Sequence, residues 1–343
     1  MDVDPQLLLL RRQYLQLFEP DFLAWPSPKL LKNVDAQKWL HRHLFDTNRN
    51  PHLPPESYQL RVLKQLTSKM GKGKANLDSD GVLGELAACL TSLIAKKVSS
   101  EIKVFQENAY VTFTCIPEKR NDYEDTSEPT LTLLEKRQLV SGSQITGFRT
   151  WEGSLHLGSY LLTEAGSHFV NGKNILELGT GTGFNAILAG KHLHANHVTA
   201  TDGDGGVIEA LRENLTLNKI DDQQQVRART LLWGQDLKGT WVEDGCRAHP
   251  YDIVLGADIT YEKSAISALV LTLQSLFDMR PKLQVIISGV VRNAETFQTF
   301  RDQCASHHFV VEDIQFEAKP MRQQKSLFYA AAVPLKLLSI TRP

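Results

Sequence analysis

Three alternating glycines, Gly179, Gly181 and Gly183, form the stretch of this chain with the clearest chemical meaning. A short aliphatic run that carries Glu177 comes directly before them. The pattern predicts a strand, a tight turn and a helix whose N-terminal amides face a ligand. Glycine suits such a turn because it lets the backbone bend sharply and approach a ligand without a Cβ. A dinucleotide-binding turn has the spacing G-x-G-x-x-G, and Phe184 occupies the place of its last glycine, which argues against that cofactor class.

The acid ahead of the glycines indicates another class of cofactor. The order apolar-apolar-Glu-apolar-Gly-x-Gly-x-Gly resembles motif I of the class I S-adenosylmethionine-dependent methyltransferases. This resemblance implies S-adenosyl-L-methionine as the cofactor, bound by Gly179, Thr180 and Gly181. Glu177 lies inside an otherwise apolar strand, where an unpaired carboxylate would be costly. We therefore expect it to accept hydrogen bonds from backbone amides or from the amino group of the cofactor.

Two further positions suit such a cofactor. Asp202 ends the predicted strand 197–202, where a carboxylate can accept hydrogen bonds from ribose hydroxyls. The alternative is that Asp202 caps the following helix, and Asp204 competes for the ribose role. Trp233 ends the predicted strand 225–233, so that its flat face can lie against adenine, with a place in the core as the alternative.

A candidate acceptor site follows the predicted strand 252–258. Ala257 is small enough to leave room for the cofactor, and Asp258 and Tyr261 can point into one cleft. The alternative role for Asp258 is to cap the helix that starts near 263, and both roles can hold together. Trp151, at the entry to an earlier helix, either covers the cofactor or belongs to the core.

The chain offers no convincing metal site. His192, His194 and His197 straddle a helix end and the next strand without an acidic or cysteine companion, so we interpret them as solvated histidines of a last turn. The four cysteines are scattered and include no C-x-x-C pair, which is typical of a reduced intracellular protein without structural zinc.

Composition limits the classes of partner. The 343 residues are 42% hydrophobic, enough for a sizeable core, and 38 basic side chains face 39 acidic ones. Because proteins that neutralise many phosphates are usually more basic, we expect no direct binding of nucleic acid. No run approaches the length of a membrane span, and the acidic start lacks the basic region of a signal peptide. We expect a cytoplasmic monomer, with the nucleus as the alternative location.

The order of elements predicts an α/β protein with a helical N-terminal extension. Proline positions and apolar periodicity predict helices through residues 1–100, followed by a hairpin from strands at 102–115 and 130–140. After Gly183, strands and helices alternate, which indicates a parallel sheet covered on both faces. The last two strands are joined too closely for a helical crossover, so we expect them to be antiparallel. We therefore predict a helical domain over 1–100 and a domain over 101–343 with a Rossmann-like seven-stranded sheet, as in class I methyltransferases. The predicted strands of that sheet are 174–179, 197–202, 225–233, 252–258, 284–292, 309–317 and 327–335, and the helices are 184–193, 205–218, 263–278 and 294–306.

Three motifs narrow the resemblance. They are Gly147-Phe-Arg-Thr-Trp151, Asp258-Ile-Thr-Tyr261 and Val291-Arg-Asn-Ala-Glu-Thr296. Together they resemble the eukaryotic methyltransferases that modify lysines of non-histone proteins, and the last one resembles the subgroup that acts on elongation factor 2. The resemblance implies a protein substrate, with Asp258 and Tyr261 beside the target amine. It also implies cofactor contacts from Trp151, Gly179, Gly181, Asp202, Trp233 and Ala257.

The expected reaction is transfer of a methyl group to a neutral lysine amine. Since free lysine has a pKa of about 10.4, selecting the neutral form costs about 4 kcal/mol near pH 7 unless the site lowers that pKa. We expect Asp258 to orient the amine, with proton transfer to it through water as an option, and Tyr261 to shape the channel. Replacing Asp258 by alanine is expected to abolish transfer and to leave cofactor binding largely intact.

Two other functions stay open on the sequence. One is an RNA or small-molecule methyltransferase, although Asp258 is followed by Ile and Thr and not by the Pro-Pro-aromatic signature of adenine N6 enzymes. The other is a non-catalytic module that binds S-adenosylmethionine and recruits a partner through its N-terminal helices. An oxidoreductase fits poorly because the sixth position of the turn is not glycine.

Overall fold

A computed structural model describes residues 3–71, 84–99, 108–119, 128–136, 146–220 and 225–343. The chain divides into two compact units. One comprises residues 1–114 and 134–141, and the other comprises residues 115–133 and 142–343.

The first unit is built mainly from helices around one apolar core. Asp4 caps the first helix by accepting a hydrogen bond of 2.8 Å from the Gln6 amide, as the Asp-Pro start predicts. The Tyr14 hydroxyl, buried in the core, donates to the Leu44 carbonyl at 2.7 Å. The third helix begins at Val34, and the Asn33 side chain caps it by accepting a hydrogen bond of 3.0 Å from the Ala36 amide. The elements are α1 (Pro5–Leu15), η1 (Pro20–Phe22), α2 (Pro28–Leu31), α3 (Val34–Leu40), η2 (His41–Phe45), α4 (Glu56–Met70) and α5 (Gly84–Ser99).

The predicted hairpin is present as β1 (Asn108–Thr114) and β2 (Thr130–Lys136), which form a two-stranded sheet. The remaining parts of the two predicted strands, 102–107 and 137–140, lie outside the described residues. The first residues of β2 belong to the second unit, where the Asn218 side chain holds Thr132. Its Oδ1 accepts from the Thr132 amide at 3.1 Å, and its Nδ2 donates to the Thr132 carbonyl at 2.7 Å.

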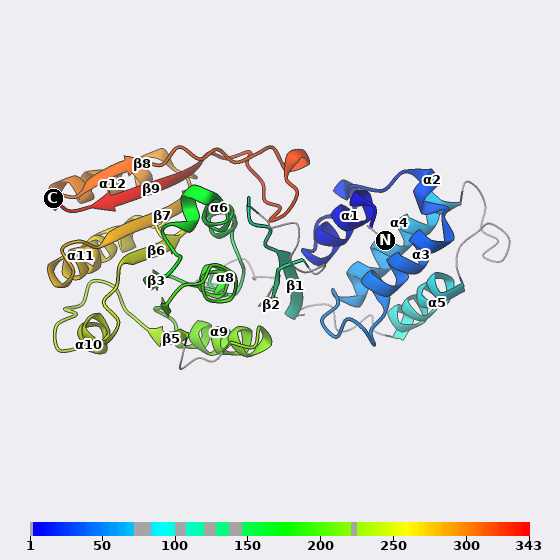
Figure 1. Cartoon of the computed structure of the whole chain (residues 1–343), viewed down its shortest axis with the longest axis horizontal. Coiled ribbons are helices and arrows are strands. Elements are labelled where there is room, and N and C mark those ends of the chain that lie inside the picture. The colour runs from blue at the N-terminus through cyan, green and yellow to red at the C-terminus, as the bar shows by residue number, and fades with distance from the viewer. Residues whose placement is uncertain (1–2, 72–83, 100–107, 120–127, 137–145, 221–224) are drawn as a thin grey trace. The chain divides into compact units, whose positions relative to one another are not determined.

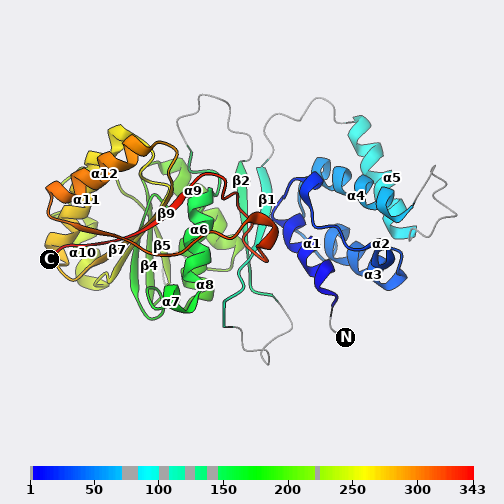
Figure 2. The same cartoon turned by 90° about the horizontal axis from the view of Figure 1, so that it is seen from above.

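A seven-stranded sheet in the order β5-β4-β3-β6-β7-β9-β8 forms the centre of the second unit. The first five strands in this order are parallel, and β9 is antiparallel to both of its neighbours. Helices α6, α8 and α9 cover one face of the sheet, and α10, α11 and α12 cover the other (Figures 1 and 2). This confirms the predicted α/β fold with a mainly parallel seven-stranded sheet and a helical N-terminal region. The strands are β3 (Asn174–Leu178), β4 (His197–Asp202), β5 (Val226–Thr230), β6 (Ile253–Ala257), β7 (Gln284–Val290), β8 (Val310–Asp313) and β9 (Leu335–Thr341), and the helices are α6 (Glu152–Leu161), α7 (Glu164–Ser167), α8 (Phe184–His192), α9 (Gly205–Leu217), α10 (Trp241–Ala248), α11 (Lys263–Met279) and α12 (Ala294–Ser306), with η3 (Met321–Gln323) before β9.

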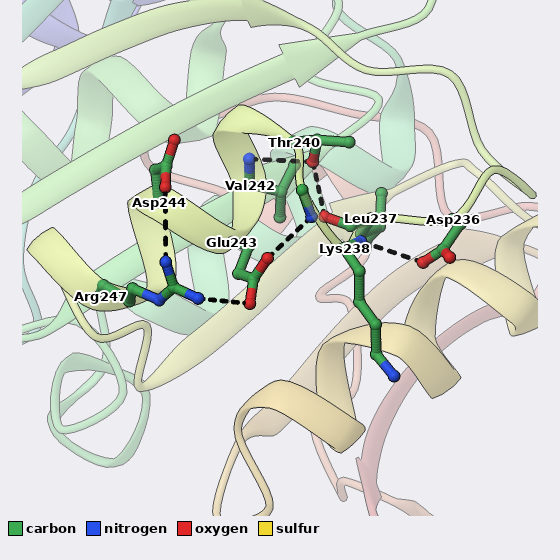
Figure 3. A network of polar contacts seen from close by, with 9 residues as sticks. Asp236, Leu237, Lys238, Thr240, Val242, Glu243, Asp244 and Arg247 are labelled. Atoms are coloured by element: carbon green, nitrogen blue, oxygen red, sulfur yellow. Dashed lines mark hydrogen bonds and ion pairs between the residues drawn. The ribbon is translucent and has the colours of Figure 1, made fainter.

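Helix α10 is absent from the sequence-based prediction, and local polar contacts explain why it forms. The Thr240 hydroxyl caps it by accepting a hydrogen bond of 3.2 Å from the amide two residues on. Glu243 accepts from the Gly239 amide and from Arg247, each at 2.7 Å (Figure 3). These contacts stabilise a helix of eight residues that also buries Val242 and Cys246, and α10 carries the chain from β5 to β6.

The predicted last strand, 327–335, was wrong in position. The strand is β9, which begins at Leu335, and its predecessor β8 is shorter than expected. The apolar run Leu327, Phe328 and Tyr329 is buried, but Leu327 has a φ of 47°, which is incompatible with an extended strand. The Tyr329 hydroxyl instead lies 3.1 Å from Nδ1 of the buried His156 on α6. The apolar run therefore packs against a helix and does not join the sheet.

Candidate functional site

A cavity of about 330 Å³ opens at the carboxyl ends of β3, β4 and β6. The chain leaves β3 toward β4 on one side, and β6 lies on the other, so this is the point where the strand order reverses. Ligands in open α/β sheets bind at such a point. Nine of the predicted site residues line this one cavity: Trp151, Gly179, Thr180, Gly181, Asp202, Trp233, Ala257, Asp258 and Tyr261.

The glycine turn requires glycine at the positions that face the cavity. Gly179 and Gly181 have φ values of 64° and 55°, in the left-handed region. A Cβ on Gly179 would lie 2.6 Å from Cγ2 of Ile259 and 3.5 Å from the ring of Trp233. A Cβ on Gly181 would approach the carbonyl oxygen of Gly147 to 3.2 Å. The turn therefore packs closely against the neighbouring segments and leaves backbone as the floor of the cavity.

Glu177 lies beneath the glycine turn and is not among the residues that line the cavity. Its carboxylate accepts a hydrogen bond of 2.5 Å from the Thr180 hydroxyl. Burial raises the pKa of Glu177 to about 7, and hydrogen bonds from Thr180, Asn185 and the Ala186 amide oppose that rise. We expected donors from backbone amides or from the amino group of the cofactor. The structure supplies the Ala186 amide and adds the side chains of Thr180 and Asn185. Glu177 thus supports the turn from below.

Asp202 and Asp204 have separate positions. Asp204 caps α9 through a hydrogen bond of 2.9 Å from the Val207 amide to Oδ1. The Asp202 carboxylate lines the cavity, where it accepts from the Gly181 amide at 3.1 Å and from the Asp204 amide at 3.2 Å. Burial raises the pKa of Asp202, while the amide hydrogen bonds hold it down. Capping of the following helix therefore falls to Asp204, and Asp202 faces the ligand space.

Asp258 joins three segments at the edge of the cavity. Its Oδ2 accepts a hydrogen bond of 2.7 Å from the Gly153 amide in the first turn of α6, and its Oδ1 accepts one of 2.9 Å from the Val290 amide at the end of β7. Its own φ is 51°, a conformation that costs an L-residue about 1 kcal/mol. Burial raises the pKa of Asp258, and the two amide hydrogen bonds and the charge of Arg292 oppose the rise. Asp258 does not cap α11, whose N-cap residue is Glu262.

Trp151 and Tyr261 both line the cavity together with Asp258, and Thr146 contacts both. The Trp151 indole donates to the Thr146 carbonyl at 3.0 Å. The Tyr261 hydroxyl lies 3.4 Å from the Thr146 hydroxyl, and the Tyr261 side chain is 48% exposed. Trp233 lies beyond the end of β5 and is half-buried, with one side against the core below α11. Trp151, Tyr261 and Trp233 therefore line the cavity, and each also contacts residues of the surrounding structure.

Several lining residues were not predicted. Gly147 is the most constrained, because a Cβ there would lie 2.8 Å from Cγ2 of Val207. Its signal was present in the motif that ends at Trp151, where only the tryptophan was assigned a role. Asp204 was considered for the ribose role, and Arg149 and Ile259 lie within motifs but were given no role. The other lining residues come together only through the fold: Thr146, Ser154, Thr182, Gly203, Val207, Leu231, Leu232 and Ala265.

The three histidines do not share one environment, which corrects their interpretation as solvated residues. His194 is exposed, and His192 is half-buried with Nε2 2.9 Å from the Thr130 carbonyl oxygen. His197 is buried, and its ring stacks on that of His249 at 4.0 Å between centroids. Strand β4 begins at His197, so the residue takes the environment of the sheet. Within the ranges that the structure covers, no group of His, Cys, Asp or Glu has the geometry of a metal site.

No helix in the described part of the chain combines the length and apolarity needed to cross a membrane.

Comparison with known proteins agrees with the motif-based resemblance. The family model for "Lysine methyltransferase" matches residues 127–305. "Protein-lysine N-methyltransferase EFM3" of Chaetomium thermophilum is 38% identical over 339 residues, covering 99% of this chain and 98% of that protein. The EFM3 protein of Saccharomyces cerevisiae is 29% identical, over 61% of this chain and 64% of the yeast protein. "Protein-lysine N-methyltransferase EEF2KMT" of Homo sapiens is 28% identical, over 62% of this chain and 64% of the human protein. The chain belongs to the lysine methyltransferase family.

Proposed function

We propose that this protein transfers methyl groups from S-adenosyl-L-methionine to a lysine side chain of another protein, with elongation factor 2 as the target. The family membership supports lysine methylation, and the name of the human relative supports the choice of target. The observation that carries the proposal is the meeting of the glycine turn, Asp202, Asp258 and Tyr261 around one cavity.

The cavity residues fit this cofactor. A volume of about 330 Å³ lies within the range of about 300–1,000 Å³ that is usual for small-molecule sites. The Asp202 carboxylate accepts hydrogen bonds from the amides of Gly181, Asp204 and Gly203, and because a carboxylate has about four acceptor sites, capacity remains for a ribose hydroxyl. Leu232 and Trp233 provide apolar surface for a base, and Gly179 and Gly181 allow the backbone to approach the ligand. When bound, S-adenosyl-L-methionine supplies a methyl group on a positively charged sulfur.

The chain's own contribution to the reaction is to orient the amine. Asp258 is held rigidly by the Gly153 and Val290 amides, and each of its oxygens has a second lone pair. It can therefore accept a hydrogen bond from the lysine amine without changing its position. Tyr261 stands at the solvent side, where its ring can line the path of the lysine side chain. Holding nucleophile and methyl group in line supplies much of the rate, because the methyl donor is already activated.

Labelling tests the proposal directly. The full-length protein is incubated with tritiated cofactor and a eukaryotic cell lysate, and portions are then treated with protease or with nuclease. We expect protease to remove the label and mass spectrometry to find it on a lysine of elongation factor 2. An Asp202→Asn variant should lose labelling, and Asp244→Asn, at an 80% exposed side chain on α10, should retain it.

Other outcomes would each contradict a part of the proposal. Label removed by nuclease would indicate an RNA methyltransferase, and label in the small-molecule fraction would indicate a small-molecule one. Cofactor binding without any labelled product would indicate a binding module. Label on a different protein would retain lysine methylation and reject elongation factor 2.

We also propose a division of labour along the chain and a setting for the enzyme. The helical residues 1–100 form a separate domain, and residues 101–343 with the hairpin form the catalytic domain. The protein acts as a cytoplasmic monomer on a protein substrate and does not bind nucleic acid directly. Gel filtration with light scattering tests the monomer, and expression of residues 101–343 alone tests the domain boundary.

A further inference from the structure

Two arginines stack on Trp151 at the rim of the cavity. The guanidinium carbon of Arg149 lies 4.9 Å from the Trp151 ring centroid, and that of Arg292 lies 5.3 Å from it. Arg149 comes from the segment before α6, and Arg292 comes from the segment after β7. The indole itself is fixed by its hydrogen bond to the Thr146 carbonyl. Cation–π contacts of this kind orient a guanidinium while leaving the N–H groups at its edge accessible.

The hydrogen-bond donors of both guanidinium groups are unused within the described residues. Glu152 lies 4.0 Å from Arg149 and 3.7 Å from Arg292, which is too far for a hydrogen bond. Nε of Arg149 is buried and has no partner there. The side chains are 35% and 46% exposed, so a ligand at the rim can reach them. The two guanidinium groups are already oriented and have unused donors, so they can bind a hydrogen-bond acceptor from a ligand.

The pair stands next to the proposed position of the target amine. Asp258 accepts hydrogen bonds from the amides of Gly153 and Val290. Gly153 is two residues after Trp151 in the sequence, and Val290 is two residues before Arg292. Arg149 lines the cavity together with Asp258. A group bound by the two arginines would therefore come from the part of the substrate that flanks the lysine.

We propose that Arg149 and Arg292 bind a carboxylate of the substrate protein, from an Asp or Glu close to the methylated lysine. This inference rests on the proposed function, since it assigns a sequence preference to the same site. Guanidinium groups match the planar carboxylate and bind it through paired N–H donors. The Asp258 carboxylate is buried and faces the proposed position of the amine, so the exposed charges at the rim are two arginines and Glu152. Among these exposed groups the two positive charges outnumber the negative one, which favours a carboxylate as the ligand.

A binding experiment tests the preference without relying on methyl transfer. Two fluorescein-labelled peptides share a central lysine and alanine spacers, and differ only in having glutamate or glutamine on both sides of the lysine. Fluorescence anisotropy is measured with the full-length protein and saturating S-adenosylhomocysteine. We expect the glutamate peptide to bind about five- to tenfold more tightly, a modest ratio because the arginines are partly solvent-exposed.

Matched variants assign that preference to the pair. Arg149→Gln and Arg292→Gln should each lower the ratio, and the double variant should bring it close to one. Arg247→Gln is the control, because this arginine lies on α10, is 70% exposed and does not line the cavity. Equal binding of the two peptides by the unaltered protein, or an unchanged ratio in the double variant, would overturn the proposal. Thermal unfolding and S-adenosylhomocysteine affinity are measured alongside to show that the variants are folded.

The outcome is separable from that of the proposed function. A glutamate preference without any labelled protein in the lysate would reject lysine methylation and retain the carboxylate site. Labelling of elongation factor 2 without a glutamate preference would do the reverse. If Arg292→Gln shifts only the pH dependence of kcat and leaves KM unchanged, the pair acts on the target amine and the docking role is wrong.

Discussion

The Asp258 carboxylate accepts a hydrogen bond of 2.7 Å from the Gly153 amide, although 105 residues separate the two in the sequence. Helix α6 has no side-chain cap of its own, since its N-cap residue is Trp151. Asp258 therefore caps α6 from the turn that follows β6, and it fixes the start of α6, together with Trp151, at the cavity. Asp258, which the sequence analysis selected to orient the amine, thus also holds the site in shape.

This relationship changes what replacement of Asp258 should do. Asp258→Ala leaves two buried amides without an acceptor, at a cost of about 1–3 kcal/mol for each. We therefore expect the variant to lose methyl transfer, to unfold at lower temperature and to bind S-adenosylhomocysteine more weakly than the parent protein. Calorimetry of the cofactor product and thermal unfolding measure the two effects. Asp244→Ala, at an exposed position, should change the free energy of unfolding by less than about 0.5 kcal/mol.

Unchanged cofactor affinity in Asp258→Ala would show that the clamp does not hold the cavity in shape. From the sequence alone we expected Asp258→Ala to leave cofactor binding largely intact. The sequence does not reveal that amides from two distant segments donate to Asp258.

The glycine turn predicts a second difference between matched variants. Gly179→Ala meets Ile259 at 2.6 Å and also adopts an unfavourable φ of 64°. Gly239 has a φ of 71° with nothing within 4 Å of an added Cβ, so Gly239→Ala carries only the backbone cost of about 1–2 kcal/mol. We expect Gly179→Ala to weaken S-adenosylhomocysteine binding more than about tenfold, because the clash displaces the floor of the cavity. Gly239→Ala should lower stability and leave binding near its original value, and equal losses of affinity in both variants would contradict this reading.

Glu177 predicts a pH dependence of stability. Its pKa is about 7 in the folded protein and near the ordinary 4.5 when unfolded, so the folded state favours the protonated form. Its contribution to the free energy of unfolding is full below about pH 4.5 and is lost as the pH rises through about 7. Glu177→Gln removes the buried charge and should stabilise the protein by at most about 3 kcal/mol at high pH.

Urea unfolding at about pH 5 and about pH 8 measures this difference, which should be small at the lower pH. The amide of the new glutamine has a nearby acceptor, because Oδ1 of Asn185 is buried without a partner among the described residues. A variant that is less stable than the parent at both values would show that the charged carboxylate is required.

The role of Tyr261 rests on its ring. Tyr261→Phe removes a hydroxyl that lies 3.4 Å from the Thr146 hydroxyl at a half-exposed position, and it keeps the aromatic wall. We expect kcat to fall less than about tenfold, because a single exposed hydrogen bond contributes about 1 kcal/mol. Tyr261→Ala should lower kcat further, because the channel for the lysine side chain loses one side. Activity is measured by mass spectrometry of the product. Similar activity of the two variants would show that the Tyr261 ring does not contribute to the site.

The sequence predicted the parallel core of the fold well because β3, β6 and β7 are apolar runs bounded by turns and strands alternate with helices throughout this part of the chain. It misplaced the last strand because Leu327, Phe328 and Tyr329 are as apolar as a strand, and their burial against α6 depends on tertiary contacts. Helix α10 escaped prediction because its eight residues are fewer than the roughly 10–12 by which a helix is told from other short segments.

The site was predicted to the extent that its residues follow strands. Gly179, Asp202 and Asp258 each stand where a strand ends, so chain order was sufficient to bring them together. Arg149 and Arg292 both lie within motifs, but the motifs do not show that the two side chains meet, because only the approach of the segments before α6 and after β7 places them on one indole. The position of Glu177 under the turn also depends on α8, which supplies two of its donors.

The margins of the large sheet bear on how the protein behaves at high concentration. Its outermost strands, β5 and β8, span only five and four residues, and β8 ends in Glu312 and Asp313. Asp313 is engaged by Arg301 and Lys336, which places several charges along that margin. Short, charged outer strands disfavour the addition of a strand from another molecule. This arrangement disfavours fibrous self-association along both margins of the sheet.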